Sequence, residues 1–84
     1  MSNTLFLDIE TTGFSTDWDY ILEIAAEIVS DVGHVIGQFH ELIRPSKPIP
    51  AKIVELTGIT NAQVADCRSE REVLRDFGEW VATH

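Results

Sequence analysis

Two acidic residues separated by one position give the sequence its clearest chemical signal. Asp8 and Glu10 lie at the end of an apolar segment, and side chains two positions apart on a β-strand point to the same side. Two carboxylates held this close repel each other unless a cation or a proton lies between them. Hard divalent cations such as Mg²⁺ take oxygen ligands, commonly one or two carboxylates together with water and a substrate phosphate. The spacing is also common at strand ends, so two exposed acids beside a turn are the alternative interpretation.

The residues after this pair suit the same chemistry. Thr11, Thr12 and Gly13 offer backbone N–H groups and small side chains, so a nucleotide could approach metal ions held by the acids. Two such ions can stabilise both the attacking and the leaving oxygen in phosphodiester hydrolysis. The residues alone are thus compatible with a metal site at the end of the first strand and with two exposed acids beside a turn.

Apolar residues in the first half of the chain predict three strands. The strands are expected at residues 4–9, 20–30 and 35–44. Gly33 lies in the short segment between the second and third strands, and a turn this short makes those two strands antiparallel.

The second half of the chain predicts helices. One is expected at residues 51–57 between Pro50 and Gly58, and a second begins after Thr60. Ser69 opens a third, longer helix with a capping-box spacing. The apolar stripe of this third helix comprises Val73, Leu74, Phe77, Trp80 and Val81.

The charge balance limits how the chain could meet nucleic acid. The formal net charge is −8, from 14 acidic residues against 6 Lys and Arg residues. Simple electrostatic attachment needs Lys and Arg on phosphates, so this balance argues against it. An enzyme that meets phosphates through bound cations stays compatible, because its acidic clusters then bind ions. Plain solubility is the alternative explanation of the charge.

The cysteine content and hydropathy indicate a reducing, cytoplasmic setting. Cys67 is the single cysteine, so no disulfide forms within one chain. The N-terminus lacks the positive charge and long apolar run of a secretory signal. The longest near-apolar stretch, residues 21–29, contains Glu23 and Glu27, so no membrane span is predicted.

The sequence around the acidic pair resembles the first motif of the DEDD-superfamily 3′–5′ exonucleases, which include ribonuclease T and the proofreading subunit of bacterial DNA polymerase III. The similar segment is LFLDIETTGF at residues 5–14. Further similar segments follow in the family's order at residues 21–26, 39–45, 49–50 and 56–60, so the resemblance covers nearly the whole chain. It implies an α/β, ribonuclease-H-like fold. Residues 1–84 would be its N-terminal portion, a three-stranded antiparallel meander followed by helices, without the later strands.

The resemblance also implies an activity and a site. The activity is hydrolysis of phosphodiester bonds at single-stranded DNA or RNA 3′ ends with two Mg²⁺ or Mn²⁺ ions. Asp8 is expected to bind both ions and Glu10 one, so these are the expected catalytic and metal-binding acids. The expected substrate-binding residues are Thr11, Thr12, Gly13, Phe14 and Ile59. Phe14 and Ile59 have core packing as an alternative role.

Two further motifs of the family find no match in the chain. They supply two more acids and a His or Tyr general base, and His34, His40 and His84 do not match that base. We therefore expect the isolated chain to be inactive. The resemblance also implies that the first strand lacks one neighbour, so we expect its apolar edge to self-associate or to bind a partner.

Two functions of other kinds stay open. The half-fold could serve as a non-catalytic interaction module. The chain could also be an unrelated small α+β domain in which the acidic pair binds Ca²⁺ or Mg²⁺ for structure alone. A structural ion should raise stability without nucleic acid, which separates this last function from a nuclease.

Overall fold

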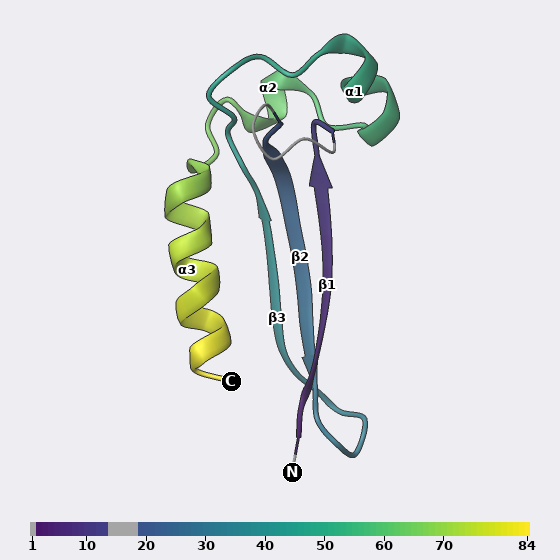
Figure 1. The fold of residues 1–84 in the computed structure, drawn as a ribbon, viewed down its shortest axis with the longest axis vertical. Coiled ribbons are helices and arrows are strands. Elements are labelled where there is room, and N and C mark those ends of the chain that lie inside the picture. Colours follow the sequence, from purple (N-terminus) through teal and green to yellow (C-terminus); the bar gives the residue numbers. More distant parts are fainter. Residues whose placement is uncertain (1, 14–18) are drawn as a thin grey trace.

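A computed structural model describes residues 2–13 and 19–84, which form three strands followed by three helices (Figure 1). The strands are β1 (Thr4–Thr11), β2 (Ile21–Val29) and β3 (Val35–Leu42). The helices are α1 (Ala51–Thr57), α2 (Asn61–Val64) and α3 (Glu70–Ala82). None of these helices has the length and apolar character needed to cross a membrane.

The sheet has the strand order β1-β2-β3, and both pairings are antiparallel. The turn between β2 and β3 closes through a hydrogen bond from Ser30 N to His34 O at 2.8 Å, with Gly33 at φ 86°. The predicted antiparallel meander is therefore confirmed. The first strand is longer than predicted, because Glu10 and Thr11 still pair with β2 and the strand ends at residue 11 rather than 9.

The strand β1 forms one edge of this sheet. Within the described residues it pairs with β2 alone, so its other side has no strand beside it (Figure 1). Apolar side chains on both of its faces are exposed: Leu5 42%, Phe6 58%, Leu7 48% and Ile9 40%. The expectation of an unpaired apolar edge on the first strand is confirmed.

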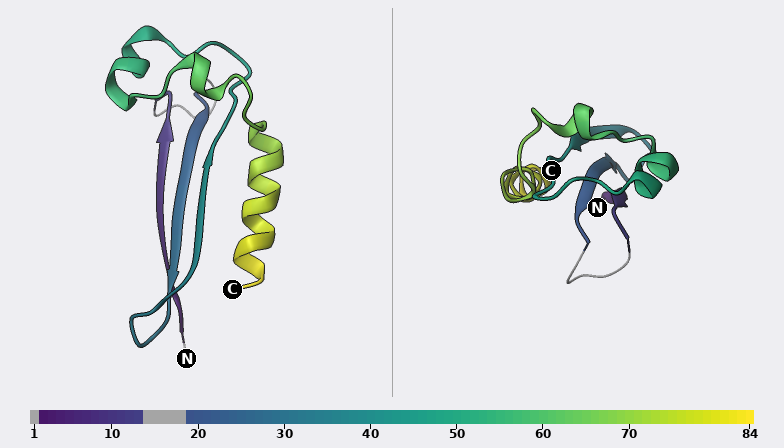
Figure 2. Two further views of the ribbon diagram at one scale, coloured as in Figure 1. Left: turned by 180° about the vertical axis from the view of Figure 1, so that it is seen from behind. Right: turned by 90° about the horizontal axis from the view of Figure 1, so that it is seen from above.

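The opposite edge of the sheet is covered by α3 (Figures 1 and 2). Val73 of α3 is buried in one core cluster with Ile24 and Ile43. Beside this cluster, Phe39 of β3 contacts Phe77 edge-on at 5.2 Å between ring centroids. Of the predicted apolar stripe on α3, Leu74 and Val81 are instead 40% and 36% exposed, because the described elements do not cover that flank.

A second core cluster lies where α1 and α2 meet the sheet. It contains the buried side chains of Leu22, Ile49, Ile59 and Val64. Asn61 holds this region together, since its side chain accepts from Ile49 N at 2.7 Å and donates to Ile49 O at 3.3 Å. This cluster fixes α2 near the end of the sheet at which β1 stops (Figure 1).

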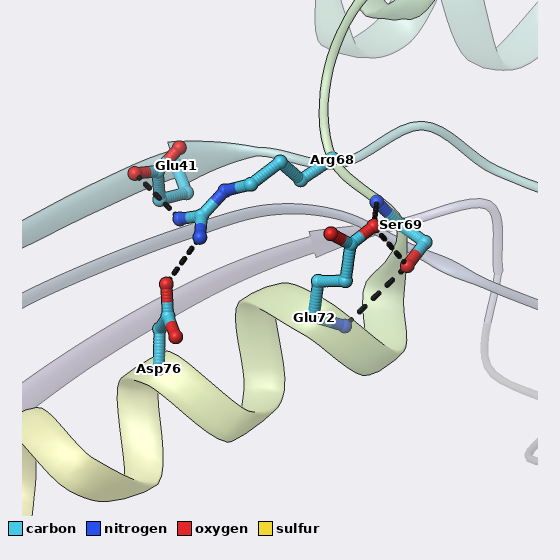
Figure 3. Close-up of polar contacts among 5 residues, drawn as sticks. All are labelled: Glu41, Arg68, Ser69, Glu72 and Asp76. Atoms are coloured by element: carbon cyan, nitrogen blue, oxygen red, sulfur yellow. Dashed lines mark hydrogen bonds and ion pairs between the residues drawn. The ribbon is translucent and has the colours of Figure 1, made fainter.

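Polar contacts fix the start of α3 against β3 (Figure 3). Arg68 donates to Glu41 at 3.1 Å and also pairs with Asp76. The predicted capping box is present, with Ser69 Oγ accepting from Glu72 N. Hydrogen bonds from the Ser69 hydroxyl and backbone N–H, with weaker help from nearby arginines, hold the pKa of Glu72 below its ordinary value of 4.5.

Candidate functional site

The acidic pair lies inside β1, close to the end of the strand. Asp8 is opposite Ala25 of β2, and Glu10 is opposite Glu23. Because the two acids are two positions apart on a regular strand, both side chains point to the same face of the sheet, as the sequence predicted. The Asp8 side chain is exposed and that of Glu10 is half-buried. Both carboxylates are thus available to a ligand from the same side.

The same face carries a third acid, Glu23, and a histidine, His40, which the sequence analysis left without a site role. Glu23 is the cross-strand neighbour of Glu10, and its Oε2 lies 2.5 Å from His40 Nε2 on β3. His40 is opposite Ala25, so it shares a row across the sheet with Asp8. This grouping depends on the register of the three strands, so the sequence pattern alone did not indicate it.

A shallow hollow of about 510 Å³ lies over this face of the sheet. Its lining includes Asp8, Phe6 and His40, with Ala25 at its centre between two longer side chains. The methyl side chain of Ala25 leaves room above the middle strand. The hollow therefore offers space next to Asp8 rather than a filled core.

Hydrogen bonds fix the backbone just beyond the acids. Thr12 is buried, and its hydroxyl donates to Asp19 Oδ1 at 2.8 Å while accepting from Tyr20 N at 2.8 Å. Thr11 Oγ1 donates to Gly13 O at 2.5 Å. A Cβ atom on Gly13 would lie 2.5 Å from Asp19 Oδ2, so only glycine fits there without moving the carboxylate. The exit of β1 is thus tied to the start of β2.

Of the other predicted site residues, Ile59 lies apart from the acids. Ile59 is buried with 6% of its surface exposed and belongs to the core cluster around Leu22. Gly58 ends α1 with φ 75°, which suits glycine. Phe14 lies outside the described residues. The structure therefore places Asp8 and Glu10 on one face of β1, whereas Ile59 lies in the core cluster with Leu22.

The donor chemistry of the acidic pair fits a hard divalent cation. Carboxylate oxygens on one face are the ligands that Mg²⁺ and Mn²⁺ favour. Within residues 2–13 and 19–84, however, no group of three or more His, Cys, Asp or Glu side chains converges as a metal site. The described residues thus place two carboxylates, those of Asp8 and Glu10, on one face of the sheet without a third converging ligand.

Comparison with known sequences places the chain among nucleases. The exonuclease family RNase_T matches residues 5–84. The DNA polymerase III PolC-type of Bacillus subtilis (strain 168) is 43% identical over 74 residues, which are 88% of this chain and 5% of that protein. The PolC-type enzyme of Thermotoga maritima is 42% identical over 71 residues, or 84% of this chain and 5% of that protein. The chain thus spans about 5% of the length of these curated relatives.

Solved nuclease structures have the same fold. Exonuclease X in complex with 5′ overhanging duplex DNA matches with a TM-score of 0.72 and 30% identity, over 87% of this chain and 42% of that one. The nuclease domain of 3′hExo, a DEDDh family member bound to rAMP, matches with a TM-score of 0.80 and 22% identity. That second match covers 96% of this chain and 44% of the other, and it supports the fold alone.

The chain therefore belongs to the exonuclease family. The resemblance to DEDD-superfamily 3′–5′ exonucleases is confirmed, and so is the ribonuclease-H-like fold class, with three antiparallel strands followed by helices. The structural matches extend over only part of the length of the solved nucleases.

Proposed function

We propose that this chain is the N-terminal part of a 3′–5′ exonuclease domain that hydrolyses phosphodiester bonds at DNA or RNA 3′ ends. The observation that carries the proposal is the position of Asp8 and Glu10 on one open face of β1 in a chain of the exonuclease family. The hollow beside them gives room for a terminal nucleotide. The solved relative bound to an overhanging DNA duplex supports a nucleic-acid substrate.

The chemistry proposed for the site uses two Mg²⁺ or Mn²⁺ ions. Asp8 would bind both ions and Glu10 one, which places negative oxygen ligands next to the scissile phosphate. Bound metal ions would supply the activated water and stabilise the charge on the leaving oxygen. Two carboxylates alone give too few ligands and no general base, so we expect the 84-residue chain by itself to be inactive.

The substrate contacts proposed for this site come from the segment after the acids. Thr12 is held by hydrogen bonds to Asp19 and Tyr20, and the Thr11 hydroxyl donates to Gly13 O, so these three residues would present an ordered backbone to a terminal nucleotide. The two remaining proposed contacts are Phe14 and Ile59. The side chain of Ile59 is buried, so its contact with a substrate would come through the backbone.

The exposed edge of β1 supports a proposal about partners. Unpaired strand edges with apolar side chains are templates for pairing with another chain. Leu5, Phe6 and Leu7 present such an edge, so we propose that the chain self-associates or binds a polypeptide along β1. The same edge is the feature that favours the second candidate function, a non-catalytic interaction module.

Binding of a paramagnetic ion tests the proposed metal site directly. Mn²⁺ titrated into ¹⁵N-labelled chain should broaden the amide signals of residues around Asp8 and Glu10 first. The Asp8→Ala variant should lose this selective broadening, because half of the carboxylate pair is gone. Asp31→Ala is the matched control, since Asp31 is an exposed acid in the turn between β2 and β3. Equal broadening in the parent chain and in Asp8→Ala would contradict the metal site.

A further inference from the structure

The connection between β3 and α1 carries a basic pocket that stands out in an acidic chain. Its lining includes Arg44, Lys47, Ser46 and Asn61, and it has a volume of about 340 Å³. Among the described residues, no carboxylate lines the pocket, although the chain has 14 acidic residues against 6 Lys and Arg. Two of the six Lys and Arg side chains therefore meet at one hollow without a described acid in its lining.

Neither basic side chain is engaged in an ion pair within the part of the chain that the structure describes. Both Arg44 and Lys47 are exposed. The ion pairs among the described residues join His40 to Glu23 and Arg68 to two other acids. The positive charges of the pocket are thus available to a ligand. The charge of Arg44 contributes to the lowered pKa of Glu72, whose carboxylate is occupied in the cap of α3.

The backbone of the pocket is held at both ends. Arg44 N donates to Arg68 O at 2.9 Å, and Arg44 forms an isolated parallel bridge with Ser69. At the other end, Asn61 makes two hydrogen bonds to the backbone of Ile49. Pro45 and Pro48 lie between these anchors, and each proline fixes one backbone dihedral. The segment that contains Arg44 and Lys47 therefore has little conformational freedom.

Contacts place this pocket next to the exit of β1. The Lys47 ammonium lies 6.0 Å from the centroid of the Tyr20 ring. Tyr20 exchanges hydrogen bonds with Thr12, which is two residues beyond Glu10. Figure 1 shows the connection and α2 at the same end of the sheet as the arrowhead of β1. Tyr20 thus contacts both Thr12, just beyond the acids, and Lys47 of the pocket.

We infer that this pocket binds a backbone phosphate of a nucleic-acid strand whose 3′ end lies at Asp8 and Glu10. An arginine fork and a lysine ammonium are the side chains that recognise phosphate best. The inference rests on the proposed function for the position of the 3′ end. It also explains how a chain of net charge −8 would bind a polyanion. Metal ions would bind the terminal phosphate, and Arg44 and Lys47 would bind one phosphate further along the strand.

Binding without divalent metal isolates this pocket from the acidic pair. A fluorescent single-stranded oligothymidylate is titrated into the chain in EDTA, and anisotropy is followed at several salt concentrations. Arg44→Gln combined with Lys47→Gln should weaken binding about tenfold at low salt. It should also reduce the slope of log K against log salt by about 0.7, the value for one phosphate contact on a single strand.

Two controls keep the result specific. Arg71→Gln combined with Arg75→Gln removes the same charge from the exposed surface of α3 and should leave affinity and slope nearly unchanged. Circular dichroism confirms that each variant is folded, and Lys47→Gln alone provides a milder variant with half the expected change in slope. Equal weakening by both double variants would overturn the proposal, because only general charge would then be acting.

The outcome also separates this inference from the proposed nuclease site. No oligonucleotide binding in EDTA, or binding of inorganic phosphate alone, would overturn the phosphate pocket even if Mn²⁺ still binds at Asp8. A pocket effect together with no Mn²⁺ binding at Asp8 would instead retain the phosphate pocket and remove the proposed nuclease site. The two measurements use different probes, so either can fail without the other.

Discussion

The two edges of the sheet differ in what covers them. At the β3 edge, α3 buries Val73 against Ile24 and Ile43, and Arg68 pairs with acids on both β3 and α3. At the β1 edge, apolar side chains on both faces are 40–58% exposed, and no described element lies beyond the strand. On β3 itself Val35 and Ile36 are 52% and 44% exposed, whereas Phe39 is half-buried against Phe77 of α3, so the neighbouring elements decide which apolar side chains become core.

One pair of cross-strand neighbours shows the same difference in burial. Ile9 and Ile24 are direct cross-strand partners on the same face of the sheet, yet Ile9 is 40% exposed and Ile24 is 1% exposed. The difference lies in α3, which reaches Ile24 and not Ile9. Stability in this chain should therefore come mainly from the β2–β3–α3 half, while the β1 half remains available for binding.

Truncation of the two isoleucines is the strongest test of this contrast. Ile24→Ala should reduce the free energy of unfolding by about 3 kcal/mol, because a buried side chain is lost and a cavity remains. Ile9→Ala should cost about 1 kcal/mol or less, because its side chain is already largely in water. Urea unfolding followed by circular dichroism measures both. If Ile24→Ala leaves too little folded protein, Ile24→Val, at about 1 kcal/mol, is the milder variant.

Equal costs for the two alanine variants would contradict the contrast. They would mean that Ile9 is as buried in solution as Ile24, so that another chain covers β1. That outcome leads to the next measurement.

A charge placed on the exposed strand tests whether β1 is a binding edge. Leu7→Lys should shift the chain from larger species to monomer, because a lysine on an edge strand opposes pairing with another chain. Size-exclusion chromatography with light scattering, over a range of protein concentrations, gives the mass. Val32→Lys is the matched control, since Val32 is 74% exposed in the turn between β2 and β3. A monomeric parent chain would show that the β1 edge does not self-associate.

The smallest expected effect concerns the cap that starts α3. The pKa of Glu72 is lowered chiefly by the Ser69 hydroxyl. A lowered pKa means that the carboxylate stabilises the fold above its unfolded pKa, and this contribution is lost as the pH falls through the lowered value. Glu72→Gln should therefore lower the urea midpoint slightly at about pH 7, and the difference from the parent chain should shrink at about pH 3.

Glu55→Gln removes an exposed carboxylate from α1 and is the control for a general effect of charge. A difference between Glu72→Gln and the parent chain that grows toward acid would mean that the capping interaction does not depend on the ionised carboxylate.

Local signals predicted most of the fold. The capping boxes at Thr60 and Ser69 and the glycine at position 58 all mark helix ends in the structure, because each satisfies backbone groups within a few residues. The exposure of Leu74 and Val81 could not be read in this way. Their periodicity places them on an apolar stripe, but burial depends on which distant element covers it.

The sequence predicted one part of the candidate site and not the rest. Alternation along one strand was enough to place Asp8 and Glu10 on one face. The proximity of Glu23 and His40 to that face depends on the register of three strands, which the local pattern does not fix. The basic pocket joins residues 44–48 to α2, so only the folded chain shows it.

The strand order β1-β2-β3 also bears on how the chain folds. Each pairing among the three described strands joins neighbours in the sequence, so this three-stranded sheet can form once Leu42 has left the ribosome. Pairings between neighbours close short loops, and proteins rich in such contacts fold quickly. The acidic pair would then be displayed on a formed strand before α3 is synthesised, and the edge of β1 would be open during that interval.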